Sequence, residues 1–148
     1  MKATRVLPAL ALFALVTVEF GGWSLLGRLT QRDALTPFEE QFFRAGHGHA
    51  GALLILSLVF FILLGRTGFA ESTQWLLGLG LLLGILLQSG GFFLHMLVGE
   101  EGASSAGTWV TRVGAVLLGA ALVTLGVGLL RGGRVAAADQ GSTTRATK

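Results

Sequence analysis

The sequence contains no cysteine, and only 13% of its 148 residues are charged. Without thiolates the chain cannot form a disulfide, hold an iron–sulfur cluster, ligate haem through sulfur or build a blue-copper centre. The scarcity of charge accompanies a hydrophobic share of 52% and a mean hydropathy of +0.71, which lie outside the range of ordinary soluble domains. The composition therefore predicts an integral membrane protein.

Most of the chain consists of apolar segments long enough to cross about 30 Å of hydrocarbon, for which a helix needs roughly 20 residues. The predicted fold is an all-α four-transmembrane-helix bundle that occupies residues 1–131. Residues 132–148 are rich in small and polar types, so we expect them to form a disordered cytoplasmic tail. The predicted spans are Val6–Leu29, Gly46–Leu64, Trp75–Val98 and Thr108–Leu130.

The positions of Lys and Arg predict the orientation of these spans. Both termini are expected in the cytoplasm, because that arrangement places more basic residues on the inner side than on the outer side. The net charge of +3 is then explained by loop residues, and nucleic acid is not an expected partner. The inner set is Lys2, Arg5, Arg66, Arg131, Arg134, Arg145 and Lys148, and the outer set is Arg28, Arg32, Arg44 and Arg112.

The first outer loop contains a helix start signal. Thr36 is suited to the N-cap, Pro37 to the first turn and Glu39 to a capping box. Apolar and charged residues alternate after it in a way that is typical of a helix lying in the membrane interface. We therefore expect a short interfacial helix that covers the outer mouth of the bundle. The apolar residues are Phe38, Phe42 and Phe43, and the charged ones are Glu39, Glu40 and Arg44.

The first span carries one carboxylate, Glu19, about 20 Å from the cytoplasmic end. Inserting a charge at this depth costs on the order of 3 kcal/mol. Glu19 is therefore expected to be protonated, paired or in contact with water. Alternatively, its side chain extends toward the outer headgroups beside Trp23 and anchors the helix there.

Two of the three histidines, His47 and His49, open the second span. Residues two positions apart on a helix point about 200° away from each other, so only one of them can face the bundle interior. The neighbouring glycines, Gly46, Gly48 and Gly51, permit close approach by another helix or by a flat cofactor. Alternatively, the histidines are an interfacial pair, one capping the helix and the other in water.

The third and fourth spans each contain a stripe of small and polar residues. In the third span the stripe ends in an amide and an imidazole, and we expect it to face inward; simple helix packing is the alternative. In the fourth span Arg112 is expected to reach the outer interface, to pair with Glu100 or Glu101, or to bind an anionic group such as a haem propionate. The stripes are Gly80, Gly84, Gln88, Gly91 and His95, and then Thr108, Arg112, Ala115, Gly119 and Gly126.

All of these polar groups lie in the outer half of their spans, which argues against a channel or transporter and favours a single site near the outer surface. Imidazoles from two helices can ligate haem iron from opposite faces. The predicted axial pair is His95 with His47 or His49, and Gln88 and Arg112 complete the predicted cofactor-binding set. A metal ion such as zinc, copper or iron, held by His47, His49, His95 and Glu19, is the alternative.

The segment Gly46 to Gly51 resembles the Gly-His-x-His openings of small membrane proteins related to the haem–copper oxidase catalytic subunit, in which such a histidine ligates a b-type haem. The chain also resembles a set of uncharacterised bacterial four-helix membrane proteins. These combine an Arg-Ala-Gly-His-x-His-Ala-Gly motif with a later Gly-Gly-Phe-Phe-x-His, here Arg44 to Gly51 and Gly90 to His95. The resemblance implies a bacterial plasma membrane and at most one haem b or metal.

Three functions remain open at this point. The first is a haem- or metal-binding protein for electron transfer or sensing at the outer face. The second is a structural or assembly subunit of a larger membrane complex, and glycine-rich faces also allow a homo-oligomer. The third is an outer-facing enzyme or pH sensor that uses Glu19 and the histidines as acid and base groups. An absorption spectrum and a metal analysis separate the first from the other two.

Overall fold

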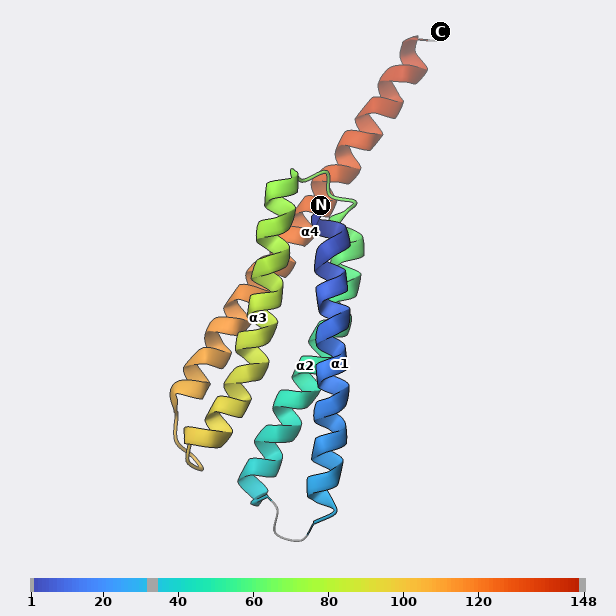
Figure 1. The fold of residues 1–148 in the computed structure, drawn as a ribbon. Helices are drawn as coiled ribbons and strands as arrows, with labels where there is room; N and C mark the ends of the chain where they lie inside the picture. The colour runs from blue at the N-terminus through green and yellow to red at the C-terminus, as the bar shows by residue number, and fades with distance from the viewer. Residues whose placement is uncertain (1, 32–34, 147–148) are drawn as a thin grey trace.

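The computed structural model describes the backbone of residues 2–31 and 35–146, and the side chains of these ranges up to residue 131. These residues form four helices, α1 (Ala3–Leu29), α2 (Pro37–Leu64), α3 (Glu71–Val98) and α4 (Ala106–Ala146), which run alternately in opposite directions (Figure 1). Each helix contains a segment long and apolar enough to cross a membrane. The predicted four-helix bundle is confirmed.

The helix α4 continues to Ala146, well beyond the predicted end of the fourth span at Leu130. The side chains of the predicted tail, residues 132–148, are outside the part of the chain that the structure describes. Its disorder stays a prediction.

The start of α2 follows the predicted capping box. The Glu39 backbone N–H donates to Thr36 Oγ1 at 3.2 Å, and the Thr36 N–H donates to Glu39 Oε2 at 2.7 Å. The structure has no separate interfacial helix in its described residues here, because Pro37–Leu64 is one continuous helix. No proline interrupts the segment after Pro37, and Gly46 fits against the ring of Phe93 without breaking the helix.

Glycines determine how closely α3 and α4 pack. A methyl group built on Gly84 would lie 3.1 Å from the Gly114 carbonyl oxygen, and one on Gly91 would collide with Thr111. On the α3 side, Gly84, Gly91 and His95 are buried, as the predicted stripe requires. The two backbones are therefore in direct contact, as in other membrane helices paired through small residues.

On α4 the stripe marked in the sequence is not the face that packs on α3. Arg112, Ala115, Gly119 and Gly126 are all exposed. The span contains small residues on several faces, and the face that packs on α3 is the one whose glycines meet the α3 backbone at Gly91 and Gln88. The buried residues of this face are Gly107, Gly114, Leu118, Ala121 and Leu125.

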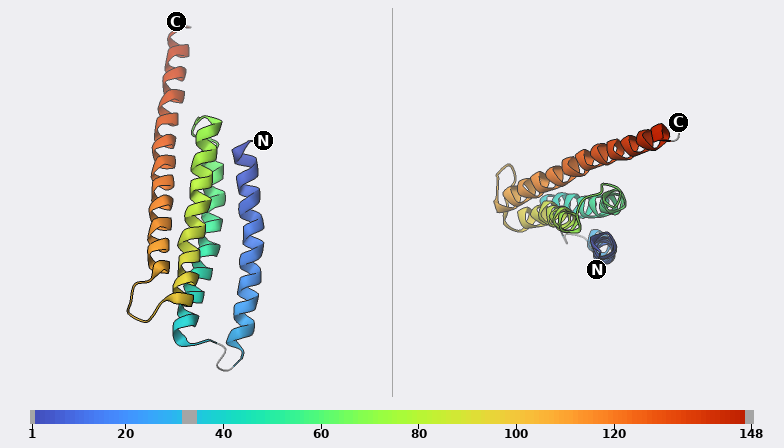
Figure 2. Two further views of the ribbon diagram at one scale, coloured as in Figure 1. Left: turned by 60° about the vertical axis from the view of Figure 1, so that its left-hand side comes forward. Right: turned by 90° about the horizontal axis from the view of Figure 1, so that it is seen from above.

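The first helix, α1, is the least buried of the four and packs mainly on α2. It meets α3 near its own start, where the Ala3 N–H donates to Glu71 Oε1 at 3.0 Å and Leu7 covers Gly78. Toward the other end α1 and α3 separate and α2 lies between them (Figure 1). In the described residues α1 and α4 do not touch, and they form opposite edges of the bundle (Figure 2).

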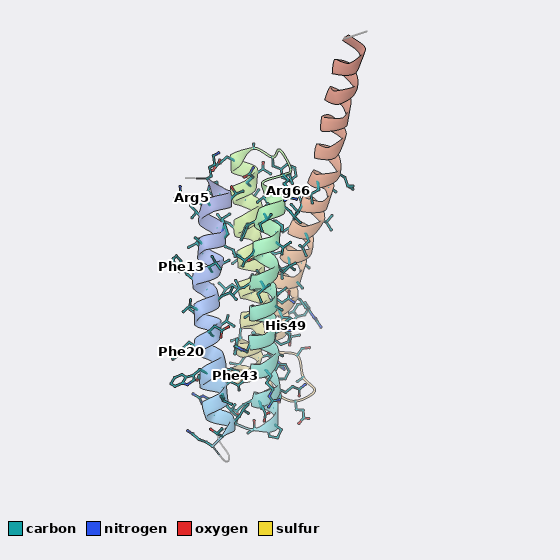
Figure 3. The ribbon with its side chains drawn as sticks, turned by 90° about the vertical axis from the view of Figure 1, so that its right-hand side faces the viewer. Arg5, Phe13, Phe20, Phe43, His49 and Arg66 are labelled. Atoms are coloured by element: carbon teal, nitrogen blue, oxygen red, sulfur yellow. The ribbon has the colours of Figure 1, made fainter. Side chains whose placement is uncertain are left out.

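The two ends of the bundle differ in the residues they carry. Arg5 and Arg66 lie at one end, whereas His49 and Phe43 lie toward the other (Figure 3). We call the latter the histidine end; it is the end at which α1 and α3 finish. Arg5 and Arg66 thus lie at the same end of the bundle. Both belong to the inner set of basic residues, from which both termini were predicted to lie on one side.

We expect the substitution Gly114→Val to destabilise the protein by about 1 to 3 kcal/mol, because the added side chain would meet the Gln88 backbone. Gly80→Val, on the neighbouring helix α3, is the control, since the space around Gly80 is open. Thermal unfolding of the detergent-purified variants measures the difference. Equal melting temperatures for the two variants would contradict the α3–α4 contact.

Candidate functional site

His47 faces α1. A methyl group on Gly22 would lie 3.1 Å from His47 Nε2, and one on Gly21 would lie 3.5 Å from Nδ1. The two glycines therefore make room on α1 for the half-buried imidazole. The side chain points away from the interface between α2 and α3, where His49 lies.

Between α1, α2 and α3 there is a half-open cavity of about 460 Å³, and His47 lines it. Volumes of roughly 300 to 1,000 Å³ are typical of small-molecule sites. The cavity exists because α1 and α3 diverge toward the histidine end (Figure 1). Its wall is almost entirely apolar, and its polar side chains are Thr17, His47 and Ser89.

Ser89 is an unusual member of this wall. Its side chain is 5% exposed, and its Oγ has no hydrogen-bond partner among the described residues. By contrast, the Thr17 hydroxyl donates to the Ala14 carbonyl at 2.6 Å. A buried hydroxyl without a partner costs about 1 to 3 kcal/mol, so a ligand that hydrogen-bonds Ser89 would recover part of that free energy.

His49 and His95 lie in a second place, an aromatic cluster between α2 and α3. The His95 ring, 7% exposed, is 4.4 Å from the Phe42 ring and 5.5 Å from Phe38. The His49 ring is 4.7 Å from the Phe92 ring. Its Nδ1 donates to the Ala45 carbonyl at 2.8 Å, and because a carbonyl only accepts, the proton sits on Nδ1.

His95 also links α3 to the start of α4. Its Nδ1 is 2.7 Å from Ser105 Oγ, and this oxygen accepts the Gly107 N–H at 3.1 Å. Ser105 immediately precedes α4, so its hydroxyl also satisfies a backbone donor of the first helical turn. The imidazole is thus explained in part by helix packing, one of the two alternatives open from the sequence.

The predicted pair of His95 with His49 does not enclose an open space, and His47, the other predicted partner, faces α1. Phe42 packs on His95, Phe92 packs on His49, and the two phenyl rings contact each other at 6.4 Å. A porphyrin between the two imidazoles would have to displace both phenyl rings. Within the part of the chain that the structure describes, no three His, Asp or Glu side chains gather closely enough to hold a metal ion.

The other predicted site residues lie elsewhere. Glu19 is exposed on α1. Gln88 lies in the α3–α4 contact, where its backbone carbonyl accepts a hydrogen bond from the Thr111 hydroxyl at 3.4 Å. Arg112 is exposed on α4, with its guanidinium carbon 4.8 Å from the centre of the Trp109 ring. Of the predicted cofactor-binding residues, the described cavity wall includes His47 alone.

Sequence reasoning missed Ser89 and the paired glycines of α1. Ser89 is adjacent to Gln88, but on a helix it faces about 100° away from it, toward α1 rather than α4. A serine in the middle of an apolar span was the available signal. Gly21 and Gly22 offered a second signal, because adjacent glycines in a membrane helix leave room for a partner side chain.

Comparison with known proteins gives no relative, since no family model, curated protein or solved structure matches the chain.

We expect Ser105→Ala to lower stability by about 1 to 2 kcal/mol, because it removes the hydroxyl shared by His95 and the first turn of α4. Ser104→Ala, at the exposed neighbouring position, is the control and should have almost no effect. Chemical unfolding followed by tryptophan fluorescence gives both values. If both variants unfold like the parent, the His95–Ser105 contact does not hold the α3–α4 connection.

Proposed function

We propose that this protein is an integral membrane protein that binds one haem b in the cavity between α1, α2 and α3, with His47 as axial ligand. The observation that carries the proposal is the cavity itself, whose apolar wall contains one imidazole. When bound, haem supplies a one-electron redox change or a position for a small ligand, so the function is electron transfer or sensing.

The donor set favours haem over a bare metal ion. A structural or catalytic metal ion requires three or four protein ligands, and the described residues bring no such group together. Haem supplies four nitrogen donors of its own, so that one or two protein ligands are sufficient. A single histidine in the wall of a cavity meets that requirement when its imidazole turns from Gly21 and Gly22 toward the cavity.

The walls also suit a flat apolar ring. Gly21 on α1 and Gly90 on α3 present backbone rather than side chains to the cavity, and Phe43 and Phe93 contribute ring surfaces. Apart from Thr17, Ser89 and His47, the remaining wall is aliphatic. The residues of this chain would therefore hold the ring through His47, pack on its faces and leave Ser89 as the buried hydrogen-bonding group.

The proposal places the site near the extracytoplasmic side. The histidine end is the outer end if both termini are cytoplasmic, as the basic residues predict. The first turns of α2, with Phe38 and Phe42 beside charged Glu40 and Arg44, then lie at the outer interface. An electron partner or ligand would reach the site from that side.

The test is the absorption spectrum of protein purified after haem supplementation. We expect a Soret band with one haem per chain, and its loss in His47→Ala. His49→Ala and His95→Ala are matched controls that should keep the band, because both rings lie in the aromatic cluster outside the cavity.

Three results would contradict the proposal. A colourless preparation would exclude haem, and stoichiometric zinc or copper in elemental analysis would replace it by a metal ion. A band that disappears in His95→Ala but persists in His47→Ala would return the cofactor to the axial pair predicted from the sequence.

A further inference from the structure

Glu19 lies on a face of α1 that no other part of the described chain covers. Its stripe includes Leu12, Val16 and Trp23, whose exposed fractions are 52%, 65% and 71%. Figure 3 shows Phe13 and Phe20 on the same helix also pointing away from the bundle. In a bilayer an isolated α1 would hold the carboxylate against hydrocarbon, which is costly, so ionisable groups in spans are usually paired.

Arg112 has the matching position on α4. Its stripe includes Trp109 and Val116, exposed by 62% and 71%. Among the described residues the ion pair is Arg44–Glu40, so neither Glu100 nor Glu101 pairs with Arg112, and Glu19 has no cation. Among the described residues, Arg112 and Glu19 therefore each lie on an exposed helix face without an oppositely charged partner.

The two stripes follow the same order. Counted from the histidine end, α1 presents Trp23, Glu19 and Val16, and α4 presents Trp109, Arg112 and Val116. Within one protomer these faces cannot meet, because α1 and α4 form opposite edges and do not touch (Figure 2). Two protomers side by side in the same orientation bring α1 of one next to α4 of the other.

We propose that this protein assembles head to tail with further copies of itself, α1 of one protomer packing on α4 of its neighbour, with an ion pair between Glu19 and Arg112. Because opposite charges lie at the centres of two apolar faces, contact with a second copy of the chain is favoured over contact with lipid. Gly119, exposed with open space around it, lets the neighbouring helix approach closely one turn beyond Val116.

The directions of the side chains favour the pair. Side chains on a helix lean toward its N-terminus, and α1 and α4 run in opposite directions. Figure 2 shows that α4 begins short of the level that α1 reaches at the histidine end. The guanidinium leans back toward the histidine end and the Glu19 carboxylate leans away from it, so the two groups converge.

This contact joins two different surfaces, so each protomer uses both edges and the assembly grows into a ring or a chain rather than stopping at a two-fold dimer. The inference does not depend on haem, because neither Glu19 nor Arg112 lines the cavity.

The absence of cysteine from the sequence makes the test direct, because any introduced thiol is the sole one in the chain. Copies carrying Val16→Cys and copies carrying Val116→Cys, with different tags, are coexpressed and treated in membranes with a short thiol-reactive crosslinker, so that Glu19 and Arg112 both remain in place. We expect a product that carries both tags. Leu76→Cys, on an exposed face of α3, replaces Val16→Cys as the control and should give none.

Charge reversal tests the ion pair itself. Glu19→Arg or Arg112→Glu alone should weaken association on the order of 30-fold, and the double reversal should restore it. Glu19→Gln and Arg112→Gln give the same loss without a new charge in the span, in case a reversed variant fails to insert. Association is measured by the mass of the detergent-solubilised or nanodisc-embedded assembly.

Three results would overturn the inference. Crosslinks between two Val16→Cys copies, without the mixed product, would indicate a two-fold α1–α1 contact. A monomeric mass that none of these substitutions changes would indicate that the exposed faces of α1 and α4 contact lipid. A mass that shows a different protein bound to α1 would indicate that this helix packs on another subunit rather than on a second copy of the chain.

Discussion

The direct backbone contact between α3 and α4 determines the rest of the structure. Because Gly84, Gly91, Gly107 and Gly114 let the two helices touch, one face of α3 packs on α4, and the rest of α3 packs on α2 and, less extensively, on α1. α1 contacts α3 near Ala3 and Leu7. Beyond that point the helices separate, and the space between them is the cavity whose wall contains His47 and Ser89.

Much of this fold is readable from the sequence. The four apolar runs fix the number of helices, and the Thr36–Glu39 capping box marks the start of α2. The glycine stripe on α3 predicts a close helix contact, which the structure has at Gly84 and Gly91. These features are local, since each depends on residues within one helix or one turn.

The site is less readable, because it depends on which helices are neighbours. His47 and His49 face opposite directions, and the sequence shows that only one can face a cofactor. The position of α1 decides that His47 lines the cavity, because Gly21 and Gly22 leave room for its ring. The Phe92 ring packs on His49. On α4 the stripe marked in the sequence is not the face that packs on α3, because a span rich in small residues offers several equivalent packing faces.

The histidines differ in role: His95 links α3 to the start of α4, and we propose that His47 holds a ligand. The most direct test of this claim is chemical rescue of His47→Gly, in which the cavity is kept and the imidazole is removed. The account predicts that the variant, supplied with haem, has no Soret band until free imidazole is added, and that the band then returns. A variant that binds haem fully without imidazole, or that never recovers it, would contradict the assignment of His47.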